Sequence, residues 1–92
     1  MTTSTRVAEI RTRLEAAFAP ELLEIVDESH KHAGHAGARD GRGHFAVRIV
    51  SDRFDGIKKL ARHRMVYAAL GSLMQTDIHA LSVVALQPGE SG

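Results

Sequence analysis

The chain has 92 residues, of which 43% are hydrophobic and 25% are charged, and its formal net charge is +1. This length predicts one small domain over residues 1–92, and the near-neutral charge gives no general argument for nucleic-acid binding. Cysteine is absent, which excludes disulfides, thiolate nucleophiles and thiolate metal ligands from this chain.

The first half of the chain predicts one helix and two strands. Ser4–Phe18 is an amphipathic helix that Pro20 ends, because its apolar residues recur at helical spacing: Val7, Ile10, Leu14 and Phe18. Leu22–Glu28 is short and β-branched in its middle, which indicates a strand. His44–Val50 alternates apolar and other residues with a period of two, as a half-buried strand does.

A long segment over about residues 29–43 separates these two strands. It holds four of the eight glycines and three of the six histidines, His30, His32 and His35. It lacks apolar periodicity and is too long for a tight hairpin. We therefore expect a mobile or functional loop.

The second half predicts two helices and a strand. Ser51 or Asp52 caps a short helix that carries Phe54, Ile57 and Leu60, and a turn near Ala61 separates it from a helix over about residues 62–73. In this second helix, the core face consists of Val66, Leu70 and Leu73, with Tyr67 beside them. A buried strand at 79–86 follows, and a disordered tail begins at about residue 88. The expected fold is α+β, in the order α-β-β-α-α-β, with the helices on one face of a three-stranded sheet.

Five motifs, in the same order, resemble those of the BolA family over about residues 6–88. They are Val26-Asp27-Glu28-Ser29-His30, His44-Phe45, Val50-Ser51-Asp52-Arg53-Phe54-Asp55-Gly56, His63-Arg64-Met65-Val66-Tyr67 and Ile78-His79-Ala80-Leu81. The resemblance implies a fold similar to a type II KH domain. The Gly-x-x-Gly loop with which KH domains hold nucleic acid is not in place, because Gly34-His35-Ala36-Gly37 lies between the strands and not between the helices.

The resemblance also implies a non-enzymatic adaptor that shares a [2Fe-2S] cluster with a monothiol glutaredoxin and glutathione, in iron–sulfur trafficking or in iron and stress regulation. By this resemblance, the cluster ligands from this chain are His79 and a second histidine in the loop. His32 matches that loop position best, with His35 as the alternative, and the residues alone do not decide between them. Imidazole ligates iron in Rieske centres, so a chain without cysteine can offer imidazole ligands only. We expect the isolated chain to be a monomer without a cluster.

The remaining histidines have plainer interpretations. From composition alone, a histidine such as His79 at a strand end is more often bonded to backbone than to a metal. His63 belongs to the helix motif and is expected to be structural or, with Arg64, part of a partner surface. His44 is expected to be an ordinary surface residue at the edge of the second strand.

An alternative function is DNA-binding transcriptional regulation, as described for members of the family. Lys58, Lys59, Arg62 and Arg64 would then contact phosphates, and binding would fall steeply with salt. The simpler interpretation of these four residues is a solvated basic face of a helix.

Catalytic motifs are lacking, which predicts that the chain is not an enzyme. There is no Walker loop, HExxH pair or nucleophile elbow. The adjacent carboxylates Asp27 and Glu28 are expected to point to opposite faces of a strand, which makes them a poor acid–base pair. The sequence has no apolar run of about 18 residues and no secretory signal near its N-terminus, so we expect no membrane span and a cytoplasmic location.

Overall fold

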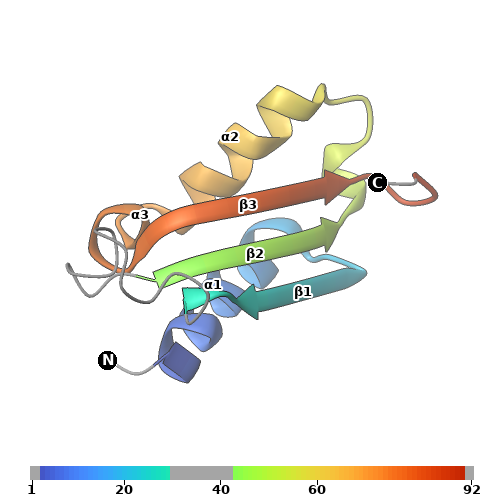
Figure 1. Cartoon of the computed structure of the whole chain (residues 1–92). Coiled ribbons are helices and arrows are strands. Elements are labelled where there is room, and N and C mark those ends of the chain that lie inside the picture. Colours follow the sequence, from blue (N-terminus) through green and yellow to red (C-terminus); the bar gives the residue numbers. More distant parts are fainter. Residues whose placement is uncertain (1–2, 30–42, 91–92) are drawn as a thin grey trace.

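A computed structural model describes residues 3–29 and 43–90, which form an α+β fold with a three-stranded sheet (Figure 1). The elements in chain order are α1 (Thr3–Phe18), β1 (Leu22–Asp27), β2 (Gly43–Val50), the short 3-10 helix η3 (Asp52–Phe54), α2 (Lys59–Leu70), α3 (Leu73–Thr76) and β3 (Ile78–Leu86). The strand order is β1-β2-β3, with β1 antiparallel and β3 parallel to the central β2. The predicted fold class and element order are therefore confirmed.

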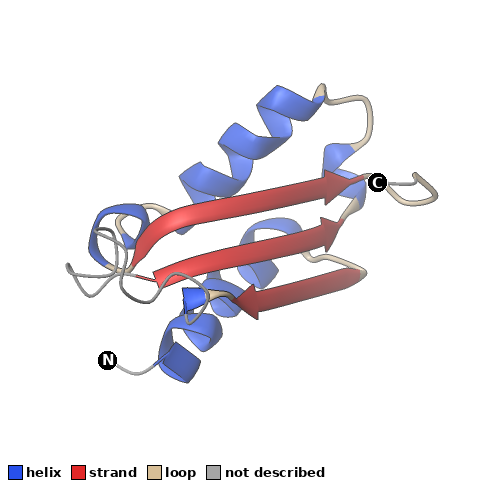
Figure 2. Ribbon diagram, in the orientation of Figure 1, coloured by secondary structure: helices blue, strands red, loops and turns tan. Residues whose placement is uncertain are grey.

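The helices α1 and α2 cover one face of the sheet, and the described residues leave the other face open (Figure 2). Alternation along β2 sends Phe45, Val47 and Ile49 toward the helices, where each is at most 3% exposed. Their neighbours in the core come from every helix and from β3: Ile10, Leu14, Phe18, Phe54, Val66, Leu70, Leu73, Ile78 and Ala85. The predicted core faces of the first helix and the second strand are confirmed.

The buried Ser51 joins the end of α1 to the segment that follows β2. Its hydroxyl donates a hydrogen bond to the Phe18 carbonyl at 2.6 Å and accepts one from the Arg53 N–H at 3.1 Å. Of the two predicted caps, Ser51 is thus the N-cap of η3.

The predicted turn near Ala61 is wrong, because α2 runs from Lys59 through that residue without a break. The chain turns instead at Gly56 and at Gly71, whose φ angles are +74° and +54°. Such angles favour glycine, so Gly71 ends α2 as its C-cap and Gly56 turns the chain between η3 and α2. As a consequence, Leu60 is 64% exposed and Tyr67 is 39% exposed, although both were assigned to apolar helix faces by periodicity alone.

A β-bulge interrupts the pairing of β3 with β2 at the end where both strands begin. Gly43 pairs with Ile78, but His44 pairs with Ala80, so His79 is the extra residue. Ile78 faces the core, His79 and Ala80 are both exposed, and Leu81 turns inward again. The bulge therefore directs His79 out of the sheet without disturbing the core register that follows it.

The C-terminal segment is held on α2 by a buried arginine. Arg62 is 5% exposed and donates to the carbonyls of Ile57 at 2.7 Å and Ala85 at 3.0 Å and to the Glu90 carboxylate at 2.6 Å. The Gln87 N–H donates to the same carboxylate, and together with Arg62 it lowers the pKa of Glu90. Within the segment predicted to be a tail, Glu90 thus bonds to Arg62 on α2 and to Gln87.

Candidate functional site

The exposed His79 lies at the end of the sheet where β2 and β3 begin. Because β-bulges redirect side chains, the bulge at this position accounts for the outward placement of His79. Ile78, the preceding residue, is 1% exposed and anchors the start of β3 in the core.

His44 is the neighbour of His79 on the adjacent strand. The centroids of the two imidazole rings are 5.1 Å apart and the rings are tilted by 49°. His44 is half-buried, and its Nε2 atom is buried. The expectation that His44 is an ordinary surface residue is therefore wrong, since the parallel pairing of β2 with β3 brings it against His79.

Backbone hydrogen bonds fix the position of His44. Its N–H donates to the Ser29 hydroxyl at 3.0 Å, and its carbonyl accepts from the Glu28 N–H at 2.8 Å. The preceding Gly43 donates to the Asp77 carbonyl at 2.9 Å, which ties the start of β2 to the residue before β3. These bonds join the residues that follow β1, the start of β2 and the residue before β3.

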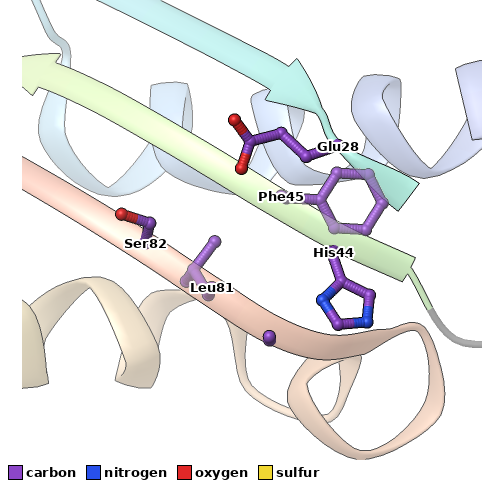
Figure 3. Close-up of a pocket in the computed structure, with 6 residues that line it drawn as sticks. Glu28, His44, Phe45, Leu81 and Ser82 are labelled. Carbon is purple, nitrogen blue, oxygen red and sulfur yellow. The ribbon is translucent and has the colours of Figure 1, made fainter. Parts of the chain in front are cut away.

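A pocket of about 230 Å³ adjoins His44 on the open face of the sheet. It is lined by Glu28, His44, Phe45, Ala80, Leu81 and Ser82. Figure 3 shows the His44 imidazole between β2 and β3, with the Glu28 carboxylate on the β1 side of the same pocket. The small side chains of Ala80 and Ser82 leave this hollow, and the polar groups at its rim suit a small polar ligand or a cation.

The other predicted metal ligands cannot be placed relative to this pair. His32 and His35, and with them His30, lie outside the described residues. Within residues 3–29 and 43–90, no group of three or more His, Asp or Glu side chains is arranged to hold a metal ion by itself. The His44–His79 pair is therefore not part of a larger group of this kind within those residues.

The predicted basic residues on α2 divide into an exposed group and a buried one. Lys58, Lys59 and Arg64 are exposed. Arg62 is buried and bonded to Ile57, Ala85 and Glu90, so its prediction as a phosphate contact is wrong. Its long side chain spans from α2 to the end of β3, a role that charge counting along the sequence cannot reveal.

His63 is half-buried and lies away from the His44–His79 pair. It lines a second pocket, of about 200 Å³, with Lys59 and with residues 83–86 of β3. Arg64, the other residue predicted for a partner surface, is exposed on α2. The expected role of His63, structural or in binding a partner, stays a prediction.

No helix in the described part of the chain is long and apolar enough to cross a membrane.

Known proteins with similar sequences and folds share one family. A family model described as BolA-like protein matches residues 14–90. The chain is 47% identical over 74 residues to the DNA-binding transcriptional regulator BolA of Escherichia coli (strain K12), covering 80% of this chain and 68% of that protein. It is 44% identical over 90 residues to SufE-like protein 1, chloroplastic/mitochondrial, of Arabidopsis thaliana, covering 92% of this chain and 24% of that protein.

Among solved structures, the BolA domain of SufE1 from Arabidopsis thaliana matches with a TM-score of 0.82 and 40% identity, over 99% of this chain and 100% of that one. By contrast, the chain spans only 24% to 60% of the full length of several plant and primate relatives. The similarity therefore covers one domain of those longer proteins.

Proposed function

This chain belongs to the BolA family, and from that premise we propose that it is a non-enzymatic adaptor that binds a monothiol glutaredoxin and shares a [2Fe-2S] cluster with it. The observation that carries the proposal is the exposed His79 on the β3 bulge, in contact with a second imidazole, in a chain without cysteine. Glutathione and a glutaredoxin cysteine supply the thiolates that this chain lacks.

The donor set fits such a shared cluster. A [2Fe-2S] cluster has four ligand positions, and imidazole replaces thiolate on one iron in Rieske centres. His79 is exposed, so a partner's cluster can reach it without unfolding the sheet. The cluster supplies electron-transfer or iron–sulfur delivery chemistry when bound, while His79 holds it and β3 orients His79. The second ligand from this chain is His32, with His35 as the alternative.

The cluster proposal predicts a spectral change that depends on His79. Purified protein is titrated into a cluster-loaded monothiol glutaredoxin with glutathione, and visible absorption and circular dichroism are recorded. We expect the wild type to change the cluster spectrum and His79→Ala to abolish the change, because an imidazole ligand is lost. His32→Ala and His35→Ala identify the second ligand, and Arg48→Ala, which removes an exposed arginine on β2, is the control. An unchanged spectrum with the wild type, or a wild-type response from His79→Ala, would rule the proposal out.

A second candidate function is DNA binding, which the name of the Escherichia coli relative and the exposed cations of α2 favour. The segment 59–70 contains no acidic residue, so the positive charges of Lys58, Lys59 and Arg64 are not neutralised along the helix. These three residues can reach phosphates while Val66 and Leu70 stay in the core.

The DNA-binding candidate predicts strongly salt-dependent affinity. In fluorescence anisotropy with a labelled duplex, each lost phosphate contact lowers the slope of log affinity against log salt by about 0.9. The triple variant Lys58→Ala/Lys59→Ala/Arg64→Ala is expected to lose roughly three such contacts, whereas Arg48→Ala, an exposed arginine on the sheet, keeps the wild-type slope. Equal slopes for the triple variant and the wild type would remove α2 from the interface.

A further inference from the structure

We propose that His44 and His79 form a binding site for a single divalent transition-metal ion, such as Zn²⁺ or Ni²⁺, in the isolated chain. The site lies at the end of the sheet where β2 and β3 begin. It shares His79 with the proposed function, but it requires no glutaredoxin, glutathione or cluster.

The separation of the two rings suits a common ion. With a metal–nitrogen bond of about 2.0–2.1 Å, an ion lies roughly 3.2 Å from each ring centre, and two rings at a tetrahedral angle have centres about 5 Å apart. The observed separation of 5.1 Å matches this value. The two imidazoles are therefore already at the spacing that a shared ion requires.

The fold constrains His44 more than it constrains His79. His44 is fixed by its backbone bonds to Ser29 and Glu28, and its ring is half-buried. His79 is exposed on the bulge, next to the buried Ile78. One imidazole is thus pre-positioned and the other is accessible, which lets an ion enter from solvent and exchange.

One carboxylate near the pair also favours a cation. The Glu28 carboxylate lines the pocket that His44 borders. The nearby Asp77 forms an ion pair with Arg6 at 3.3 Å, so it is committed to a structural role beside β3. Borderline metals such as zinc, nickel and copper bind imidazole well, whereas calcium and magnesium prefer oxygen ligands. The ligand is therefore an imidazole-binding transition metal, with water or a partner's donor in the remaining positions.

Because His79 is shared, an ion at this pair and a cluster bound through His79 exclude each other. Under the proposed function, occupancy by a mononuclear ion would block cluster binding until the ion is released. Cluster binding by the adaptor would thus depend on the concentration of a second metal.

The test measures Zn²⁺ and Ni²⁺ binding to the whole purified chain by isothermal titration calorimetry. The parent protein carries His30→Ala, His32→Ala and His35→Ala, so that binding by these three histidines is removed. We expect one ion per chain in this parent, at least tenfold weaker binding in His44→Ala and in His79→Ala, and unchanged binding in His63→Ala. If His44→Ala does not fold, His44→Gln replaces it in the titration.

An independent measurement uses the chain without substitutions. In ¹H–¹⁵N spectra of the imidazole nitrogens, Zn²⁺ is expected to shift the signals of both His44 and His79 and to leave His63 in place. The site does not exist if the triple-alanine parent binds no ion, or if His44→Gln binds as well as the parent. Either failure leaves the cluster titration unaffected, and a failed cluster titration leaves this result unaffected, so the two proposals are tested separately.

Discussion

Replacing Arg62 with alanine is expected to destabilise the folded protein by about 3 kcal/mol, because charged hydrogen bonds to buried carbonyls are lost and a long, buried side chain is removed. Arg62 is 5% exposed and donates to the carbonyls of Ile57, which precedes α2, and Ala85, which lies in β3. Urea denaturation at pH 7 measures the loss. Arg62→Lys keeps the charge but cannot donate in several directions at once, so it is expected to recover little of the stability.

The control for this prediction is Arg64→Ala, which removes an exposed arginine two residues further along α2 and is expected to change stability by less than about 0.5 kcal/mol. Equal losses in the two variants would contradict a specific role for Arg62.

The variant Glu90→Gln distinguishes the contribution of the Arg62–Glu90 ion pair to stability from that of the Arg62 bonds to carbonyls. Because the pKa of Glu90 is lowered by the Gln87 N–H and by Arg62, its contribution to stability is present above its ordinary pKa of 4.5 and is lost as the pH falls below it. The wild type should therefore lose more stability than Glu90→Gln on acidification through this range.

Gly43→Ala is expected to destabilise the protein by about 2–3 kcal/mol through overpacking. A Cβ atom at this position would lie 2.7 Å from Cε2 of Phe45 and 2.7 Å from the Ser29 hydroxyl. Phe45 is 2% exposed and packed in the core, so its ring cannot move away without opening a gap elsewhere. Thermal or urea unfolding measures the effect.

The matched control is Gly56→Ala. At Gly56 nothing lies within 4 Å of the added Cβ, but φ is +74°, so only the backbone strain of about 1 kcal/mol is expected. A loss at Gly43 no larger than at Gly56 would mean that the Phe45 contact relaxes freely. Gly43→Ala should also weaken metal binding at the neighbouring His44, whereas Gly56→Ala should not.

Periodicity in the sequence was sufficient to predict most of the fold. The helix that ends at Phe18 and the strand through Val47 each have one strongly apolar face, and burial of that face fixes both their type and their orientation. The boundaries of α2 were not predictable in this way. Gly71 ends α2 and Gly56 turns the chain before it, both with positive φ angles, and a glycine in a sequence does not reveal which conformation it adopts.

The candidate site was predictable only in part. His79 is identified by the motif around it, but its contact with His44 depends on the register between two strands that are far apart in the chain. One signal was present: both histidines stand at the start of a predicted strand, and parallel neighbours begin at the same edge of a sheet. Using it requires knowing that β2 and β3 are adjacent and parallel, which local patterns do not contain.

Arg62 shows another limit of prediction from sequence, because a local pattern of charge does not reveal which residue is buried. Its sequence neighbours Lys59 and Arg64 are exposed, and all three look alike in a count of positive charge. Only the position of Ala85 and Glu90 beside α2 distinguishes the buried residue from the exposed ones.

The parallel pairing of β2 with β3 also has a consequence for the order of folding. β1 and α1 can pack on β2 through contacts that are closer in sequence, but β3 reaches β2 only after the whole helical segment between them has been enclosed in a loop. Closing that loop costs chain entropy before any strand–strand contact repays it, so docking of β3 is expected to be a late event. His44 and His79 meet only at that step. An ion or a partner that needs both histidines will therefore select chains that have completed folding, and will slow the release of β3 from chains that have bound it.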